Sequence, residues 1–293
     1  MTRYPFHTLD VFTRQRFGGN PLAVFPYAEG LDAATMQMLA AEMNYSETAF
    51  VLPTYAQGAD FRVRIFNRQH EMPFAGHPNV GTAYLLASLG LIENRVIFEE
   101  QAGLVAVDIL YDAGKPTGAR IEAPQALSVL GEIDPAAIAG CLQVAPQDVV
   151  TRTHMPTRAS VGVDFVLVEV SADALAAATP DLQAYRGVVA ARAELQGRLS
   201  IFAYTRVDAG VRARMFAPLA GTWEDPATGS ANAALAALLL GGSDVEELAY
   251  RAVQGVEMGR PSMLAVSAWR EGKAIRAGVS GHCVDIFSGR IDL

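Results

Sequence analysis

The sequence predicts an α+β protein built from two similar halves, and three observations support this class. The chain has 293 residues, which is long for one compact core and suits two units of about 150 residues each. A strand-loop-helix pattern occurs once in each half at nearly the same spacing. Short segments of alternating hydrophobicity, separated by glycine or proline, make up most of the remainder. We therefore expect a first half over residues 1–123 and a second over residues 124–293, whose last strand packs back on the first half.

The internal repeat involves a strand and the helix that follows it. Residues 62–66 resemble residues 212–216, which lie 150 positions later (62 to 212). Residues 76–83 can be laid over residues 224–231, where proline, glycine, a hydroxyl group and alanine match at a separation of 148 (76 to 224). Because both blocks occur in the same order at nearly equal separation, duplication explains them better than chance does.

The remaining elements are predicted from hydrophobic periodicity. Each copy of the repeat continues into an apolar helix, which we expect at residues 78–89 and 229–240. Two amphipathic segments, at residues 33–43 and 182–195, indicate further helices. Turn-forming residues between alternating segments at residues 112–118 indicate a β-hairpin just before the boundary between the halves.

Composition and charge argue against several classes of function. Hydrophobic residues make up 51% of the chain and charged residues 18%, so the chain can bury a large core. Acidic residues outnumber basic ones by 31 to 23, whereas nucleic-acid-binding proteins normally carry a basic surface. No apolar run approaches the ~20 residues of a membrane span, and the first residues lack the pattern of a signal peptide. We expect a cytoplasmic protein that binds neither nucleic acid nor membranes.

The sequence lacks the residue patterns that would hold a cofactor or a metal. The only lysines, Lys115 and Lys273, lie in turn-like segments, which argues against a Schiff base or pyridoxal phosphate. Residues 76–82 resemble a phosphate loop but contain no lysine before the hydroxyl residue, and no dinucleotide-binding loop is present. The five histidines and two cysteines show no metal-ligand spacing. We expect no cofactor and no metal.

One acidic residue is a candidate catalytic group. Glu47 lies between the hydroxyl-bearing Ser46 and Thr48, with Tyr45 and Phe50 nearby. Aromatic surroundings would disfavour the charged form of the carboxyl group, and the two hydroxyls could orient it to take and return a proton. On these residues alone, a glutamate pointing to water from an edge strand is the better explanation.

Polar residues near the two repeated helices form a second candidate site. His77 and Asp225 occupy equivalent positions in the alignment, each before a helix whose first N–H groups can bind an anion. Two helix starts on opposite walls of one cleft would favour a substrate carboxylate. The two side chains could instead simply cap their helices, with Gly81 and Gly229 supplying the turns. Capping and substrate binding are compatible.

Together the motifs resemble those of the PhzF-like (phenazine-biosynthesis isomerase) family. The Ser-Glu-Thr and Glu-Asp-Pro-Ala-Thr-Gly-Ser segments begin 178 residues apart (46 to 224) and are far more specific together than either alone. The matching segments span most of the chain: Asn20-Pro21, Ser46-Glu47-Thr48, Phe74-Ala75-Gly76-His77-Pro78, Gly81-Thr82-Ala83, Glu224-Asp225-Pro226-Ala227-Thr228-Gly229-Ser230-Ala231 and Gly259-Arg260-Pro261-Ser262.

The resemblance implies a diaminopimelate-epimerase-like fold, in which each half is a mostly antiparallel sheet wrapped around a central helix and the active site lies between the halves. It implies a cofactor-independent isomerase with Glu47 as the general acid and base, acting on a small anionic metabolite such as trans-2,3-dihydro-3-hydroxyanthranilate. A homodimer is also implied. We expect the substrate to be held by His77, Asp225 and Ser230, together with Gly76, Gly229 and Asn20. Asn79 departs from the pattern, since threonine or a similar residue is expected there.

Two alternatives remain open. The first is an epimerase or racemase of an amino or hydroxy acid that replaces the cysteine pair of related enzymes with Glu47 and Asp225, since Cys141 and Cys283 lie outside the matched loops. Hydrogen exchange at one carbon, as against transfer between two carbons, would separate it from the isomerase. The second is a non-catalytic metabolite-binding protein, which predicts tight binding without deuterium incorporation in heavy water.

Overall fold

The computed structural model describes residues 2–208 and 210–293, which form two compact units. Unit 1 comprises Met1–Pro124, Ser262–Leu264 and Gly278–Leu293, and unit 2 comprises Gln125–Pro261 and Ala265–Ala277. The chain passes from unit 1 to unit 2 after Pro124, and the end of the last strand, Gly278–Leu293, belongs to unit 1, where it pairs with the first strand. Within the described residues, no helix combines the length and apolar character needed to cross a membrane.

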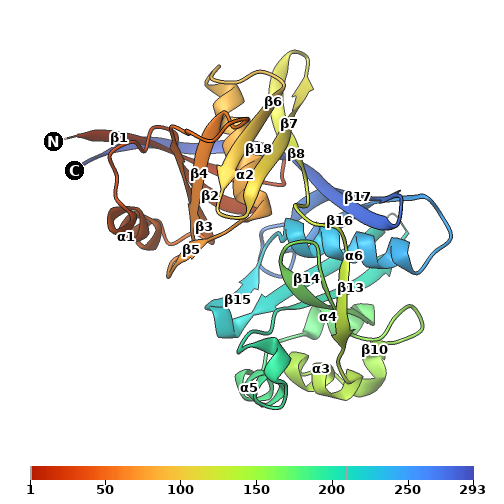
Figure 1. Ribbon diagram of the computed structural model, residues 1–293. Helices are drawn as coiled ribbons and strands as arrows, with labels where there is room; N and C mark the ends of the chain where they lie inside the picture. The colour runs from red at the N-terminus through yellow and green to blue at the C-terminus, as the bar shows by residue number, and fades with distance from the viewer. Residues whose placement is uncertain (1, 209) are drawn as a thin grey trace. The chain divides into compact units, whose positions relative to one another are not determined.

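Unit 1 is a closed barrel around a central helix (Figure 1). Pairing runs β1–β2–β3–β4–β6–β7–β8–β18 and returns to β1. The pairs β2–β3 and β4–β6 are parallel, and the short β5 pairs antiparallel with the end of β4. Helix α2 (Gly76–Ser88) is buried on all sides from Gly76 to Ala87, as expected of a core helix. The strands are β1 (Arg3–Val11), β2 (Asn20–Phe25), β3 (Glu47–Leu52), β4 (Phe61–Phe66), β5 (Glu71–Met72), β6 (Arg95–Glu100), β7 (Gly103–Asp112), β8 (Lys115–Glu122) and β18 (Ala274–Asp292).

Unit 2 repeats this order of elements. Pairing runs β9–β11–β12–β13–β14–β16, where β12–β13 and β14–β16 are parallel, like β2–β3 and β4–β6 of unit 1. β15 pairs antiparallel with the end of β14, as β5 does with β4, and the apolar helix α6 (Gly229–Gly241) contacts β11, β12 and β16. The strands are β9 (Ser128–Glu132), β10 (Val149–Val150), β11 (Thr157–Ser160), β12 (Asp164–Val170), β13 (Ile201–Val207), β14 (Gly210–Ala217), β15 (Thr222–Asp225), β16 (Glu247–Gln254) and β17 (Ser262–Glu271). The predicted α+β class with two similar halves is confirmed.

Most of the predicted local elements are present. Helix α1 (Ala33–Met43) has the predicted bounds, and the turn between β7 and β8 has positive φ at Ala113 and Gly114, as a tight hairpin requires. Helix α5 (Leu182–Ala190) ends five residues before the predicted end at residue 195, because the extended backbone of Arg192 (φ −137°) interrupts it. The sequence analysis missed the short helices α3 (Pro135–Leu142) and α4 (Ala172–Ala177).

The starts of the two central helices correct the alignment of the repeats. Helix α2 begins at Gly76 and α6 begins at Gly229, 153 positions later (76 to 229). His77 is therefore equivalent to Ser230, each being the second residue of its helix, and the predicted equivalence of His77 with Asp225 is wrong. Asp225 is the last residue of β15 and precedes α6 by four positions.

Two asparagines support the corrected alignment. The Nδ2 atom of Asn79 donates to the main-chain oxygen of Ala75 at 3.0 Å, and that of Asn232 donates to the oxygen of Thr228 at 2.9 Å. The separation is 150 at the repeated strands but 153 at the helices (79 to 232), because unit 2 has an additional 3₁₀ turn, η3 (Pro218–Ala220), between β14 and β15. The alignment from the sequence placed matching prolines and glycines opposite each other and therefore did not reveal this three-residue insertion.

Gly81 lies inside α2 and does not supply a turn at its start. A Cβ atom there would lie 2.5 Å from Cδ2 of Leu22 and 2.8 Å from Cγ2 of Val11. Both of these side chains are fully buried. Glycine at this position therefore allows the helix to approach β1 and β2 closely.

Candidate active site

Glu47 is the first residue of β3, and its side chain exposes 16% of its surface. The strand pairs with β2 on one side and β4 on the other, so the explanation of Glu47 as an edge-strand residue is wrong. Side chains alternate along a strand, and the neighbouring Thr48 is buried on the opposite face. Its hydroxyl has no hydrogen-bond partner among the residues that the structure describes, so the expectation that Thr48 orients the carboxyl group is also wrong.

Three of the predicted site residues meet in unit 1. The Nδ1 atom of His77 lies 3.4 Å from Oε2 of Glu47 and 3.4 Å from Nδ2 of Asn20. Asn20 is the fully buried first residue of β2, and its Oδ1 atom accepts a hydrogen bond of 3.2 Å from the hydroxyl of Ser46. The start of α2, which includes the buried Gly76, brings His77 to the ends of β2 and β3.

His77 carries no charge at neutral pH. The residue is 5% exposed, and burial lowers the pKa of its imidazole to about 3, although a hydrogen bond with the backbone of Pro21 partly opposes this shift. The contact between His77 and Glu47 is therefore a polar contact between a neutral ring and a carboxyl group, despite having the spacing of a salt bridge. The contact is not a hydrogen bond, so the ring lies beside the Glu47 carboxyl group without neutralising it.

The other predicted residues lie in unit 2, around the loop that leads from β15 to α6. Asp225 is 7% exposed, and its Oδ2 atom accepts a hydrogen bond of 2.6 Å from the hydroxyl of Thr228. Gly229 is buried and Ser230 is partly exposed. The N-cap residues are Ala75 in α2 and Thr228 in α6, and neither makes a side-chain capping hydrogen bond. His77 is the second residue of α2 and Asp225 the last residue of β15, so neither is the N-cap residue of its helix.

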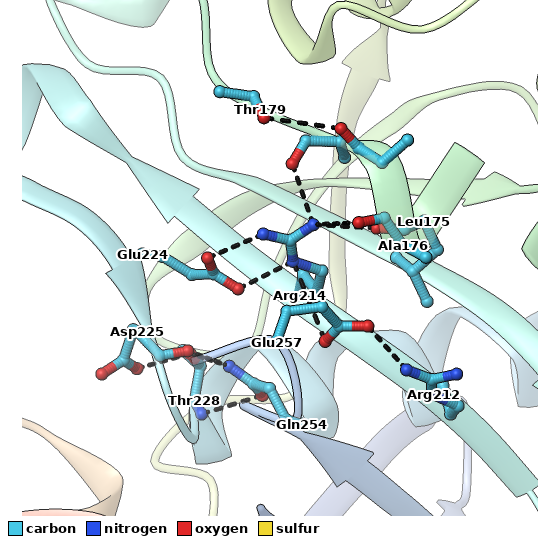
Figure 2. A network of polar contacts seen from close by, with 12 residues as sticks. Leu175, Ala176, Thr179, Arg212, Arg214, Glu224, Asp225, Thr228, Gln254 and Glu257 are labelled. Carbon is cyan, nitrogen blue, oxygen red and sulfur yellow. Dashed lines mark hydrogen bonds and ion pairs between the residues drawn. The ribbon is translucent and has the colours of Figure 1, made fainter. Parts of the chain in front are cut away.

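A glutamine that the sequence analysis missed holds this loop in place (Figure 2). Gln254 is the last residue of β16 and is fully buried. Its Nε2 atom donates to the main-chain oxygen of Asp225 at 2.8 Å and to Oγ1 of Thr228 at 2.9 Å. Its Oε1 atom accepts from the backbone N–H of Thr228 and from Nδ2 of Asn232, both at 3.1 Å.

Each unit also has an arginine–glutamate pair at the strand that precedes its central helix. Arg214 donates from Nε and Nη2 to the carboxylate of Glu224, at 2.8 Å each, and Arg64 donates in the same way to Glu71, at 2.7 and 2.5 Å. The guanidinium groups lie over Phe216 and Phe66 respectively. Arg214 is the more deeply buried of the two, and its Nη1 atom also donates to the main-chain oxygens of Leu175, Ala176 and Ala178 (Figure 2).

Glu100 is the counterpart of Gln254 in unit 1. In the strand register, Arg62 of β4 lies opposite Glu99 of β6, and the equivalent Arg212 of β14 lies opposite Val253 of β16. The residues that follow, Glu100 and Gln254, therefore occupy equivalent positions. Burial raises the pKa of Glu100 to about 8, and the nearby side chain of Asn79 opposes this shift only in part. No local sequence pattern indicates this buried acid.

The chemistry available to the cysteines is limited. Cys141 and Cys283 are both free and buried. Burial raises the pKa of Cys141 to about 12, and it raises the pKa of Cys283 further. Both are therefore neutral thiols near pH 7, which is unsuited to the paired cysteine bases of an epimerase. Among residues 2–208 and 210–293, no group of three or more His, Cys, Asp or Glu side chains could hold a metal ion.

Comparisons with known proteins define the family. Residues 9–289 match the family model PhzC-PhzF, described as phenazine biosynthesis-like protein. The chain is 36% identical over 296 residues to an uncharacterized isomerase of Mesorhizobium japonicum, with 96% of both chains covered. It is 34% identical to trans-2,3-dihydro-3-hydroxyanthranilate isomerase of Pseudomonas fluorescens, with 97% of this chain and 98% of the relative covered.

A solved structure agrees with this match. The PhzF-family phenazine biosynthesis protein of Bacillus anthracis superposes with a TM-score of 0.87 at 23% identity, over the full length of both chains. The fold is therefore the diaminopimelate-epimerase-like fold that the resemblance implied. The chain belongs to the PhzC-PhzF family of phenazine biosynthesis-like proteins.

Proposed function

We propose that this protein is a cofactor-independent isomerase that moves a proton between two carbons of a small carboxylic acid. The observation that carries the proposal is the pairing of the Glu47 carboxyl group with the neutral, buried ring of His77, at 3.4 Å. Relatives named as isomerases support the reaction class. The substrate named for the Pseudomonas fluorescens relative makes trans-2,3-dihydro-3-hydroxyanthranilate the first candidate.

In the proposed reaction, Glu47 acts as both base and acid. Its carboxylate removes a proton from one carbon, and the resulting carboxylic acid returns that proton to another carbon on the same face of the substrate. The substrate gains and loses no atoms or electrons overall, so no redox partner is needed. The buried ring of His77, which Asn20 contacts at 3.4 Å, lies beside the carboxyl group during both transfers and limits where it can move.

We further propose that the polar groups at the two helix starts bind the substrate. In unit 1 these are Asn20, Gly76 and His77, and in unit 2 they are Asp225, Gly229 and Ser230. The first N–H groups of α2 and α6 have no partners within their helices, which suits them to bind the substrate carboxylate.

The test is turnover of trans-2,3-dihydro-3-hydroxyanthranilate in heavy water, followed by NMR. A positioned acid–base group contributes roughly 10²–10⁴-fold in rate, so Glu47→Gln should reduce turnover by that factor while preserving the thermal midpoint and ligand affinity. Glu42→Gln, an exposed change on α1, is the matched control and should leave turnover unchanged.

Three outcomes would contradict the proposal. Near-normal turnover by Glu47→Gln would remove Glu47 from the mechanism. Deuterium exchange with inversion at a single carbon, without transfer to a second one, would indicate an epimerase instead. Tight ligand binding without any deuterium incorporation would indicate a binding protein.

A further inference from the structure

We infer that Gln254 is a positioning residue of the active site, whose side-chain amide directs the hydroxyl of Thr228 at the carboxyl group of Asp225. This inference rests on the proposed function, in which Asp225 binds the substrate. Gln254 itself contacts the loop between β15 and α6 and is fully buried.

The main chain fixes which way the amide of Gln254 faces. A carbonyl oxygen can only accept a hydrogen bond, so the NH₂ group must face the main-chain oxygen of Asp225, 2.8 Å away. A backbone N–H can only donate, so Oε1 must face the backbone nitrogen of Thr228, 3.1 Å away. A flipped amide would lose both bonds, and the orientation therefore follows from the chemistry of its partners.

This orientation sets the direction of the next hydrogen bond. The second N–H of Gln254 donates to Oγ1 of Thr228 at 2.9 Å, which occupies a lone pair of that oxygen. The hydroxyl hydrogen is then available for Oδ2 of Asp225, at 2.6 Å, a short distance typical of a hydroxyl donating to a carboxylate. The amide, the hydroxyl and the carboxyl group thus form one directed chain (Figure 2).

The backbone around Gln254 is built for this close approach. Gly255 has φ of +76°, and a Cβ atom there would lie 2.7 Å from the main-chain oxygen of Pro226 and 2.6 Å from that of Arg260. Because both obstacles are backbone atoms, only glycine lets the end of β16 lie against the loop that carries Asp225.

The directed chain is specific to unit 2. Glu100 occupies the position of Gln254 in unit 1, but the residue equivalent to Thr228 is Ala75, which has no hydroxyl (75 to 228, a separation of 153). The equivalent loop of unit 1 therefore lacks this hydroxyl, whereas in unit 2 the hydroxyl of Thr228 bonds to the Asp225 carboxyl group and Gln254 bonds to the helix asparagine.

The test uses near-isosteric variants in the same isomerase assay. Gln254→Glu replaces the NH₂ group with an oxygen that cannot donate when ionised; because burial raises the pKa of the equivalent Glu100 to about 8, the assays are run above pH 8. Thr228→Val removes the hydroxyl while keeping the side-chain shape. A misplacement of about 1 Å can cost ~10²-fold, so we expect kcat/KM to fall by roughly 10- to 100-fold in both variants. Thr228→Ser should restore near-normal activity. Gln37→Glu is the matched control, because Gln37 also donates to a main-chain oxygen, that of Asn67 at 2.9 Å.

Two further readouts separate positioning from a merely structural role. Activity of Gln254→Glu should partly recover as the pH falls, since a protonated carboxyl group can again donate to Thr228, whereas Thr228→Val should show no such recovery. In an Asp225→Asn background, Gln254→Glu should add little to the loss, because both changes break the same chain. Independent, multiplicative losses would overturn the inference.

Failure of the inference and failure of the proposed function give different patterns. If Asp225→Asn itself has normal kcat/KM, then the proposed role of Asp225 is wrong. If Asp225→Asn is impaired but Gln254→Glu and Thr228→Val are both normal, then Asp225 functions without this chain and the inference alone is overturned.

Discussion

Two buried ionisable side chains of unit 1 couple the stability of the fold to pH in opposite directions. The pKa of Glu100 rises from its ordinary value of 4.5 to about 8, so between these values the folded protein binds more protons than the unfolded chain, and stability falls as pH rises. The pKa of His77 falls from 6.5 to about 3, so stability falls as pH drops through that range. From these two groups, stability should be greatest between pH 4.5 and 6.5.

Glu100→Gln should remove the alkaline part of this dependence. Each pH unit over which one proton is bound differently changes the free energy of unfolding by about 1.4 kcal/mol, so the wild type should lose stability between pH 6.5 and 8 while the variant stays nearly constant. Urea unfolding at several pH values measures this directly. Glu93→Gln, an exposed change just before the same strand, serves as the control. Identical slopes for Glu100→Gln and the wild type would contradict the prediction.

At the scale of single elements, the packing of α2 depends on Gly81. Gly81→Ala should gain up to ~1 kcal/mol from helix propensity but lose about 1–3 kcal/mol by overpacking against Leu22 and Val11. We therefore expect a net loss of stability, measured by urea unfolding. Gly140→Ala in α3 is the control, because a Cβ atom there would meet no atom within 4 Å, and this change should not destabilise the protein. A gain of stability in Gly81→Ala would show that α2 can shift without cost.

Elements with a strong local signal were the most predictable from sequence. The apolar run of α6 and the turn residues of the β7–β8 hairpin identify their structures without any tertiary information. The sequence alignment of the repeats assigned the wrong counterpart to His77, because comparing identical residues alone does not reveal the three-residue insertion Pro218–Ala220.

The candidate site was less predictable because its contacts join distant parts of the chain. Glu47 and His77 lie 30 positions apart (47 to 77), and only the family resemblance connected them. Gln254 is a single polar residue at the end of a strand, and its hydrogen-bond partners lie 22 to 29 positions away in the sequence. No neighbouring residue therefore indicates its role. The arginine–glutamate pairs did leave a signal, since Arg64 and Arg214 both precede a phenylalanine by two positions within the repeat.

At the scale of the whole molecule, each unit contains an arginine–glutamate pair, so the effect of replacing the arginine can be compared between the two units. Arg214→Met should leave the carboxylate of Glu224, whose side chain is only 11% exposed, without its cationic partner. It should also remove the donor that three main-chain oxygens share. Breaking a buried pair in this way costs about 3–5 kcal/mol. Arg64→Met should cost less, because Arg64 and Glu71 are 17% and 20% exposed. Equal losses in the two variants would show that burial does not set the strength of these pairs.

The closure of unit 1 by β18 has a consequence for the order in which the protein matures. Strand β1 pairs with β18, and the N–H of Thr2 donates to the oxygen of Leu293 at 2.7 Å. At about 5–20 residues per second, the ribosome needs roughly 15–60 s to supply this partner after starting the chain. All residues of unit 2 are synthesised before residue 278, so every residue of unit 2 can be present while β1 still lacks its partner strand β18. The half of the protein that is made first is therefore the half that finishes folding last.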